Sequence, residues 1–173
     1  MKKLYNTLHA INEVTGKAIA WLTLLMMLVT FSVVLLRYMF DLGWVAMQES
    51  VVYMHATVFM LGAAYTMKHQ GHVRVDIFYQ RFTVKTRAWV DLIGTLLLLF
   101  PVSIFIAWMG WEYVVDAWRV HEGSREAGGL PGVFLLKSLI ILMPTLLIVQ
   151  GLAMLIEQIL IITGNPSIEK QNG

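Results

Sequence analysis

The chain has 173 residues, of which 58% are hydrophobic and only 14% are charged, and its mean hydropathy is +0.68. A soluble domain of this length is usually about a quarter charged. The sequence contains no cysteine, which excludes disulfides, thiolate catalysis and cysteine-ligated metal sites. The formal net charge of +2 is too small to indicate a nucleic-acid partner. These features predict an integral membrane protein and exclude a soluble enzyme.

Long apolar blocks predict an all-α fold, a single membrane domain over residues 1–173 built as a bundle of four transmembrane helices. The predicted spans are residues 18–38, 49–67, 88–118 and 133–162. The third span would be about 45 Å long against a hydrocarbon core of about 30 Å. It and the long fourth span must tilt, kink or protrude, and Pro101 and Pro144 offer places for a kink.

The segment before the first span is predicted to be an amphipathic helix. Its apolar residues recur on one helical face: Leu4, Leu8, Ile11, Val14 and Ala18. Residues 1–17 are therefore expected to lie on the membrane surface and to lead into the first span.

Basic residues are distributed unevenly between the two sides of the predicted bundle. One side carries Lys2, Lys3, Lys17, Lys68, Arg74, Arg81, Lys85, Arg87 and Lys170. The other side carries Arg37, Arg119, Arg125 and Lys137. Because loops rich in lysine and arginine stay in the cytoplasm, both termini and the 68–87 loop are predicted to be cytoplasmic. The 40–48 and 119–132 loops are predicted to face outward.

The 68–87 loop fits two interpretations equally well. Its apolar residues Val75, Phe78, Tyr79 and Phe82 have helical spacing beside a basic stripe of Arg74, Arg81 and Lys85. This pattern is typical of a short helix half-sunk in the inner leaflet, but a simple basic loop has the same composition. The candidates for contact with lipid headgroups are Lys17, Arg74, Arg81 and Lys85.

The outer loop from Arg119 to Pro131 mixes both charge signs with three glycines. A solvated turn explains this composition, since glycine permits tight turns and proline can open the next helix. The functional alternative is a docking surface for a partner outside the membrane. The docking candidates are Glu122, Ser124, Arg125, Glu126, Leu130 and Pro131.

Polar residues within membrane spans are candidates for function. One stripe of the third span consists of Asp91, Thr95, Leu98, Val102, Phe105, Met109, Glu112 and Asp116. It is expected to face other protein, with its acids paired to Arg37, Arg119 or Lys137. A proton or cation relay is the alternative, although no carboxylate lies near the middle of this span. In the other spans, Gln150 is expected to hydrogen-bond to a neighbouring helix and Gly62 to permit close packing.

His55 is the only histidine well inside a predicted span. A haem bundle usually needs a pair of histidines in its core, so no haem is expected and His55 is expected to be a packed, hydrogen-bonded interior residue. The sequence shows no phosphate-binding loop, no metal-ligand spacing and no nucleophile–base arrangement. We therefore expect no catalytic residue, metal or cofactor. The spans also show no convincing internal repeat, so a complete alternating-access pathway within this chain alone is not expected.

Two segments carry a resemblance to a known family. The first runs from Trp44 through Glu49 and Tyr53 to Leu61-Gly-Ala-Ala-Tyr65, then Gly71-His-Val-Arg-Val-Asp76 and Tyr79. The second consists of Gly123-Ser124, Gly129-Leu-Pro131, Lys137, Pro144 and Gln150-Gly151. With these pieces in this order on four spans, the chain resembles the small membrane subunit of tripartite ATP-independent periplasmic (TRAP) transporters over roughly residues 15–162.

The resemblance implies a place in a sodium-driven importer of organic acids in a bacterial or archaeal cytoplasmic membrane. In such systems a periplasmic binding protein delivers substrate to a large membrane subunit, which carries the substrate and sodium sites. The small subunit is expected to brace the immobile scaffold in contact with membrane lipids. The candidates for structural or interface roles are Glu49, Tyr53, Gly62, Arg74, Asp76, Asp91, Thr95 and Gln150. A stand-alone channel or exporter remains the alternative.

Charge reversal at Arg74 or Asp76 is predicted to loosen the complex with the large subunit, because the resemblance makes both of them candidates for structural or interface roles. The measurement is co-purification of the two membrane subunits in mild detergent. Recovery of the large subunit at the unmodified level would contradict this prediction.

Overall fold

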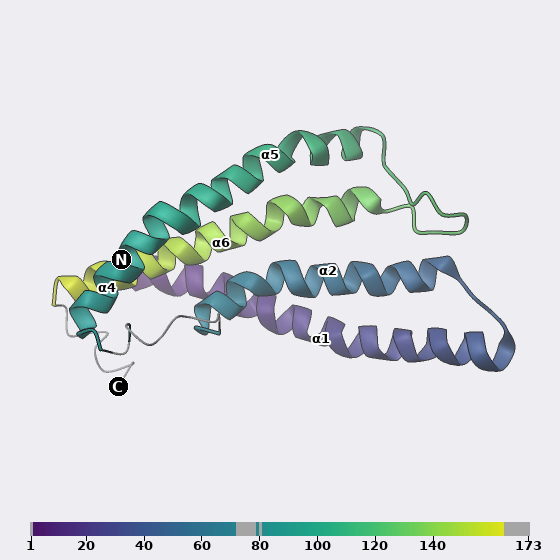
Figure 1. Cartoon of the computed structure of the whole chain (residues 1–173), viewed down its shortest axis with the longest axis horizontal. Helices are drawn as coiled ribbons and strands as arrows, with labels where there is room; N and C mark the ends of the chain where they lie inside the picture. Colours follow the sequence, from purple (N-terminus) through teal and green to yellow (C-terminus); the bar gives the residue numbers. More distant parts are fainter. Residues whose placement is uncertain (1, 72–78, 80, 165–173) are drawn as a thin grey trace.

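The computed structural model of the chain describes residues 2–71, 79 and 81–164. Its elements are the helices α1 (Lys2–Phe40), α2 (Val45–Lys68), α4 (Val84–Gly94), α5 (Phe100–Arg119) and α6 (Val133–Ile162) and the π-helix η1 (Thr95–Leu99) (Figure 1). The described residues contain no strand. Since α4, η1 and α5 run on as one helix, the described part of the chain contains four helices that are long and apolar enough to cross a membrane. The all-α bundle with four spans is confirmed.

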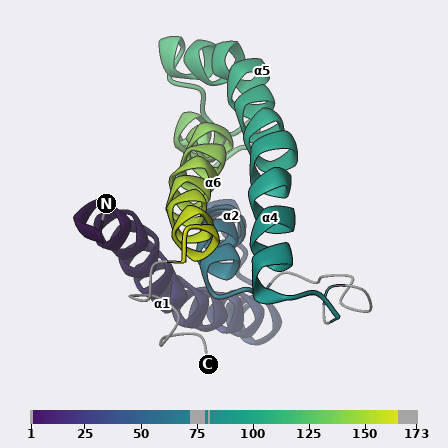
Figure 2. The same cartoon turned by 90° about the vertical axis from the view of Figure 1, so that its left-hand side faces the viewer.

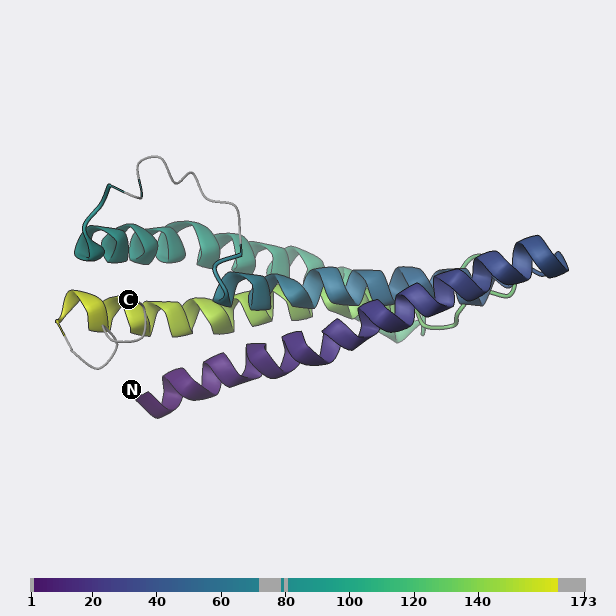
Figure 3. The same cartoon turned by 90° about the horizontal axis from the view of Figure 1, so that it is seen from below.

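The helices run back and forth between two ends of the molecule. The terminal end, as we name it, contains the start of α1 and the end of α6, and the distal end contains the connections over residues 41–44 and 120–132 (Figure 1). Helix α6 is central, since it contacts all the other helices. Helix α1 packs on α2, and the first part of α1 and α4 lie on opposite sides of α6 (Figures 2 and 3).

Glycines allow the closest helix approaches. A Cβ atom added at Gly16 of α1 would lie 2.0 Å from Cδ2 of Tyr65 on α2. One added at Gly151 of α6 would lie 2.6 Å from Cε1 of Phe100. At Gly62 the nearest atom is Cδ1 of Ile19 at 3.6 Å, an ordinary van der Waals contact. The tight α1–α2 contact therefore depends on Gly16, which was not predicted from the sequence.

The irregularity expected at Pro101 takes the form of the π-helical turn η1 just before it. Proline lacks an N–H, and its ring clashes with the carbonyl one turn earlier, so a widened turn relieves the backbone. Thr95 at the start of η1 donates its hydroxyl hydrogen to the backbone oxygen of Asp91 at 2.8 Å. By contrast, α6 continues through the buried Pro144 to Ile162.

The amphipathic helix expected over residues 1–17 is not a separate element, because α1 continues unbroken from Lys2 to Phe40. Its polar side packs on the protein, where Asn12 is 1% exposed. Its apolar side faces outward, with Val14 67% exposed. An outward apolar face suits contact with lipid, and its placement at the membrane surface stays a prediction.

The helix expected from the spacing of residues 75–82 falls mostly outside the described residues. Of the residues that define it, the structure describes Tyr79, Arg81, Phe82 and Lys85, of which the last three are exposed. Arg87 at the start of α4 donates its Nε–H to the backbone oxygens of Tyr79 and Phe82, each at 3.1 Å. This contact attaches the end of the connection to α4.

Replacing Gly16 with alanine is predicted to destabilise the purified chain by about 1–3 kcal/mol, because the new methyl group would overlap the base of the Tyr65 ring. The matched control is Gly62→Ala in the same helix pair, where space exists and the change should stay within about 1 kcal/mol of neutral or stabilise α2. Thermal unfolding in detergent measures both. Equal melting temperatures for the two variants would show that the Gly16 contact does not limit stability.

Candidate functional site

A carboxylate of α2 holds the outer loop at the distal end. Glu49 accepts a hydrogen bond from the hydroxyl of Ser124 through Oε1 and one from the backbone N–H of Leu130 through Oε2, the latter at 2.6 Å. A Cβ atom added at Gly129 would lie 2.9 Å from Glu49 Oε1. Glycine is thus required where the loop closes over the carboxylate. Glu49, a candidate from the sequence, ties α2 to the 120–132 loop.

Tyr53 lies one helical turn after Glu49 and beneath the same loop. Its ring is near Gly132, where an added Cβ atom would lie 3.7 Å from Cε1 of Tyr53. Its hydroxyl is buried and has no hydrogen-bond partner within the described part of the chain. The structure therefore places Tyr53 as a packing residue under the loop.

A second set of contacts joins α5 to α6 at the distal end. Lys137 forms an ion pair with Glu122 at 2.5 Å, and its Nζ lies 3.8 Å from the ring centroid of Tyr113. The indole N–H of Trp118 donates to Ser138 Oγ at 2.8 Å. Lys137 therefore binds the loop acid rather than an acid of the predicted stripe.

The loop has a defined backbone shape. The N–H of Ser124 donates to the Leu130 oxygen at 2.9 Å, and the N–H of Gly129 donates to the Glu126 oxygen at 3.0 Å. Gly128 has φ +78°, a left-handed conformation that favours glycine. Of the docking candidates, Glu122, Ser124 and Leu130 hold the loop, while Arg125, Glu126 and Pro131 are exposed. Docking at these exposed residues stays a prediction.

The terminal end has its own charge cluster around Glu13 of α1. This carboxylate pairs with Lys68 at 2.6 Å, with Lys17 at 3.0 Å and with His69 at 3.1 Å. Lys68 also donates to the backbone oxygen of His9 at 3.2 Å. The cluster fixes the end of α2 against α1. Glu13 was not among the candidates predicted from the sequence, although its spacing of four residues from Lys17 is typical of a helical ion pair.

An amide pair lies in the interior. Asn12 of α1 donates its Nδ2 hydrogen to Oε1 of Gln150 on α6 at 3.0 Å, and each residue is 1% exposed. Gln150 thus forms the interhelical hydrogen bond that the sequence predicts, and its partner Asn12 was not foreseen. The contact makes Gln150 a structural residue within this chain.

The predicted stripe of the third span divides at η1. Asp91 accepts a hydrogen bond from the hydroxyl of Tyr79 at 2.6 Å, and Thr95 is buried. The later members are exposed: Leu98, Val102, Phe105, Met109, Glu112 and Asp116. A π-helical turn holds an extra residue and rotates the helix after it by about 100°, so an α-helical spacing cannot follow one face across it. Of the expected basic partners, Arg119 binds Asp116 at 2.8 Å.

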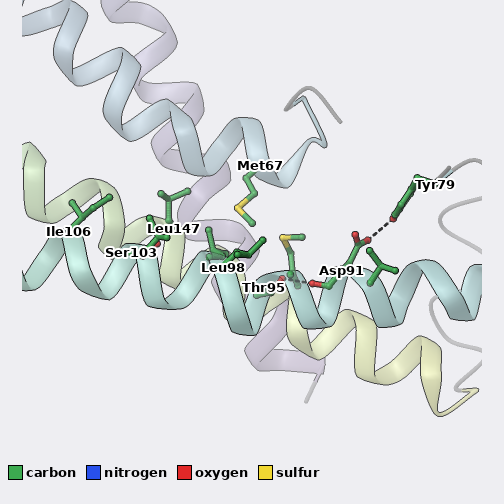
Figure 4. A pocket seen from close by; sticks show the side chains of 13 residues that line it. Met67, Tyr79, Asp91, Thr95, Leu98, Ser103, Ile106 and Leu147 are labelled. Atoms are coloured by element: carbon green, nitrogen blue, oxygen red, sulfur yellow. Dashed lines mark hydrogen bonds between the residues drawn. The ribbon is translucent and has the colours of Figure 1, made fainter. Parts of the chain in front are cut away.

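A groove of about 600 Å³ lies between α2 and the α4–η1–α5 helix (Figure 4). Its walls are mainly apolar, with Met67 on α2, Leu98 on η1 and Leu147 on α6. The hydrogen-bonded pair of Asp91 and Tyr79 lies at one end of the groove (Figure 4). Chemically, such a groove accepts an apolar segment or an acyl chain.

The prediction that His55 is a packed, hydrogen-bonded interior residue is wrong. The side chain is exposed on α2 and stacks on Phe59 with ring centroids 6.4 Å apart. In the part of the chain that the structure describes, neither ring nitrogen forms a hydrogen bond. The error has a physical reason, because apolar residues surround every face of a membrane helix and the sequence does not show which stripe is buried.

Replacing Glu49 with glutamine is predicted to loosen the outer loop, because a neutral amide cannot accept from both Ser124 and Leu130 with the strength of a carboxylate. Backbone amides over residues 124–130 should exchange with deuterium about tenfold faster, as expected for the loss of one charge-assisted hydrogen bond. Glu126→Gln in the exposed part of the same loop is the control and should leave exchange unchanged. Unaltered exchange in Glu49→Gln would refute the anchoring role.

No curated protein and no solved structure matches the chain. A family model described as "Tripartite ATP-independent periplasmic transporters, DctQ component" matches residues 26–160. The match takes in the second part of α1 from Met26 onward, all of α2, α4, η1 and α5 and nearly all of α6, and it includes the Glu49 anchor with the loop it holds. The chain therefore belongs to the DctQ component family of tripartite ATP-independent periplasmic transporters.

Proposed function

We propose that this small TRAP transporter subunit is an immobile scaffold that braces a large membrane subunit during sodium-driven import of an organic acid. In this proposal a periplasmic binding protein delivers the acid to the large subunit, which carries the substrate and sodium sites. The members of this family are transporter components rather than enzymes. We assign no catalytic residue to this chain.

The observation that carries the proposal is the outward exposure of large apolar side chains along the bundle. Trp21 on α1 and Phe59 on α2 are each 73% exposed, and Trp108 on α5 is 75% exposed. The helices lie around α6 and do not close into a compact barrel (Figure 2). Such an open arrangement presents broad surfaces to lipid and to other membrane helices, which is what a bracing subunit needs.

The two ends of the molecule support an orientation across the membrane. We propose that the terminal end, with Lys17, Arg81 and Lys85 exposed, faces the cytoplasm and its anionic lipid headgroups. The distal end would then face the periplasm, where the exposed Arg125, Glu126 and Pro131 are available to the binding protein. The excess of lysine and arginine at the terminal end supports this orientation.

The experiment begins with affinity purification of the tagged chain from its native membranes in mild detergent. A stoichiometric large membrane subunit is expected to co-purify. Proteoliposomes containing both subunits should then take up the labelled organic acid when the loaded binding protein and an inward sodium gradient are supplied. Liposomes containing this chain alone should show no uptake.

Two results would overturn the proposal. Uptake or ion conductance by this chain alone would identify a stand-alone channel or exporter. Full uptake by the large subunit without this chain would remove the bracing role. A potassium gradient in place of sodium serves as the control for the driving ion.

A further inference from the structure

The face shared by α1 and α2 contains a shallow hollow with a histidine on its wall. The hollow has a volume of about 540 Å³ and is lined by Met26, Met27, Thr30, Val51, Val52 and His55. Around it, Phe31 is 65% exposed and Phe59 is 73% exposed. This face is therefore concave, apolar and open, except for two polar side chains.

The two polar side chains differ in how their hydrogen-bonding capacity is met. Thr30 donates its hydroxyl hydrogen to the backbone oxygen of Met26 at 2.7 Å, the usual way for a membrane helix to satisfy such a group. His55 has only the stacking contact with Phe59, and within the described residues neither of its ring nitrogens forms a hydrogen bond. Within the described residues the imidazole is thus a polar group without a hydrogen-bond partner.

The position of His55 along α2 places it at mid-membrane. Helix α2 runs from Val45 to Lys68, only a little longer than a hydrocarbon core of about 30 Å. Trp44 before it and Lys68 at its end are the residue types that favour the two membrane interfaces. His55 is about 15 Å from Val45 and about 20 Å from Lys68 along the axis. The ring is too far from either interface to reach water.

Lipid cannot satisfy a polar ring at this depth. Acyl chains offer no donor or acceptor, and an unpaired polar group in hydrocarbon costs several kcal/mol. Polar side chains at such positions are found facing protein, where a hydrogen bond from a neighbouring helix compensates. The flexible Met26 and Met27 beside the ring suit a surface that must fit another helix.

The exposed face of α5 does not need a comparable hydrogen-bonding partner. Phe105 and Met109 are 58% and 64% exposed and need only apolar surroundings. Glu112 is exposed as well, but the α4–η1–α5 helix has 36 residues and is about 54 Å long, well beyond the core thickness. The length of that helix allows Glu112 to lie outside the hydrocarbon.

We propose that the α1–α2 face around His55 is the docking surface for the large membrane subunit. The inference rests on the proposed function and adds which helices form the interface. The occupant is a transmembrane helix of the large subunit whose side chains fill the hollow and which presents a hydrogen-bonding group to the His55 ring at mid-membrane.

The first test maps the contact by photo-cross-linking in the intact complex. A benzophenone side chain placed at Val52 or Phe59 should cross-link to the large subunit. The same probe at Phe105, an equally exposed position on α5, is the matched control and should react mainly with lipid. Cross-links from Phe105 without any from α2 would overturn the proposal, as would cross-links from α2 that reach only lipid or a second copy of this chain.

The second test removes the hydrogen bond and leaves the shape. His55→Leu should raise the apparent dissociation constant of the two-subunit complex in detergent about threefold to tenfold, the range for one interhelical hydrogen bond in a membrane. His55→Gln keeps a donor and an acceptor and should stay close to the unmodified chain. An unchanged affinity in His55→Leu would overturn the role of the ring.

Failure of the proposed scaffold function and failure of the proposed docking surface give different results. If no large subunit co-purifies with the unmodified chain, the proposed scaffold function fails and the docking surface fails with it. If the large subunit co-purifies and supports uptake but contacts only α5, the function stands and the α1–α2 interface is overturned.

Discussion

The fold depends on the interactions that hold apolar helices together inside a membrane, where water is absent. In a membrane the hydrophobic effect gives no drive for one apolar helix to leave lipid for another, so close backbone contact and interior hydrogen bonds must hold the bundle. This chain meets that constraint at a few positions along the central α6. Gly151 lets α6 lie against Phe100, and Gln150 beside it bonds to Asn12 of α1. One turn of α6 thereby joins both sides of the molecule.

Carboxylates complete the framework toward the two ends of the molecule. Glu13 pairs with Lys68 and His69 and so holds the end of α2 against α1. Glu49 accepts hydrogen bonds from the 120–132 loop and so holds the loop on α2. Charge-assisted hydrogen bonds are strong and directional, so they fix geometry as well as adding stability. The polar contacts at the two ends and the Asn12–Gln150 amide pair hold α1, α2, α6 and the loop together, while the faces turned away from α6 remain apolar.

Most of the fold was predictable from local sequence properties. Hydropathy and length locate four spans because a membrane helix must be long and apolar throughout, and Gln150 was recognisable because an amide inside a span needs a partner. The choice of buried face was not predictable, since all faces of such a helix are apolar. His55 was therefore wrongly placed in the interior, and Gly16 and Asn12 were missed. The stripe from Asp91 to Asp116 does not stay on one face of the helix, because η1 changes the helical register between its members.

The combination of ends held by polar contacts and open apolar faces fits the proposed role of an immobile scaffold. A partner that docks on the outer loop would press on a segment held by Glu49 of α2 and by the Glu122–Lys137 pair to α6. The same two helices are held to α1 by the Glu13 cluster and the Asn12–Gln150 pair. A force applied to the loop is thus transmitted to α1 and α2, which form the α1–α2 face, and to α6, which supports them. If that face binds the large subunit, docking outside the membrane and bracing within it act on one mechanically connected body.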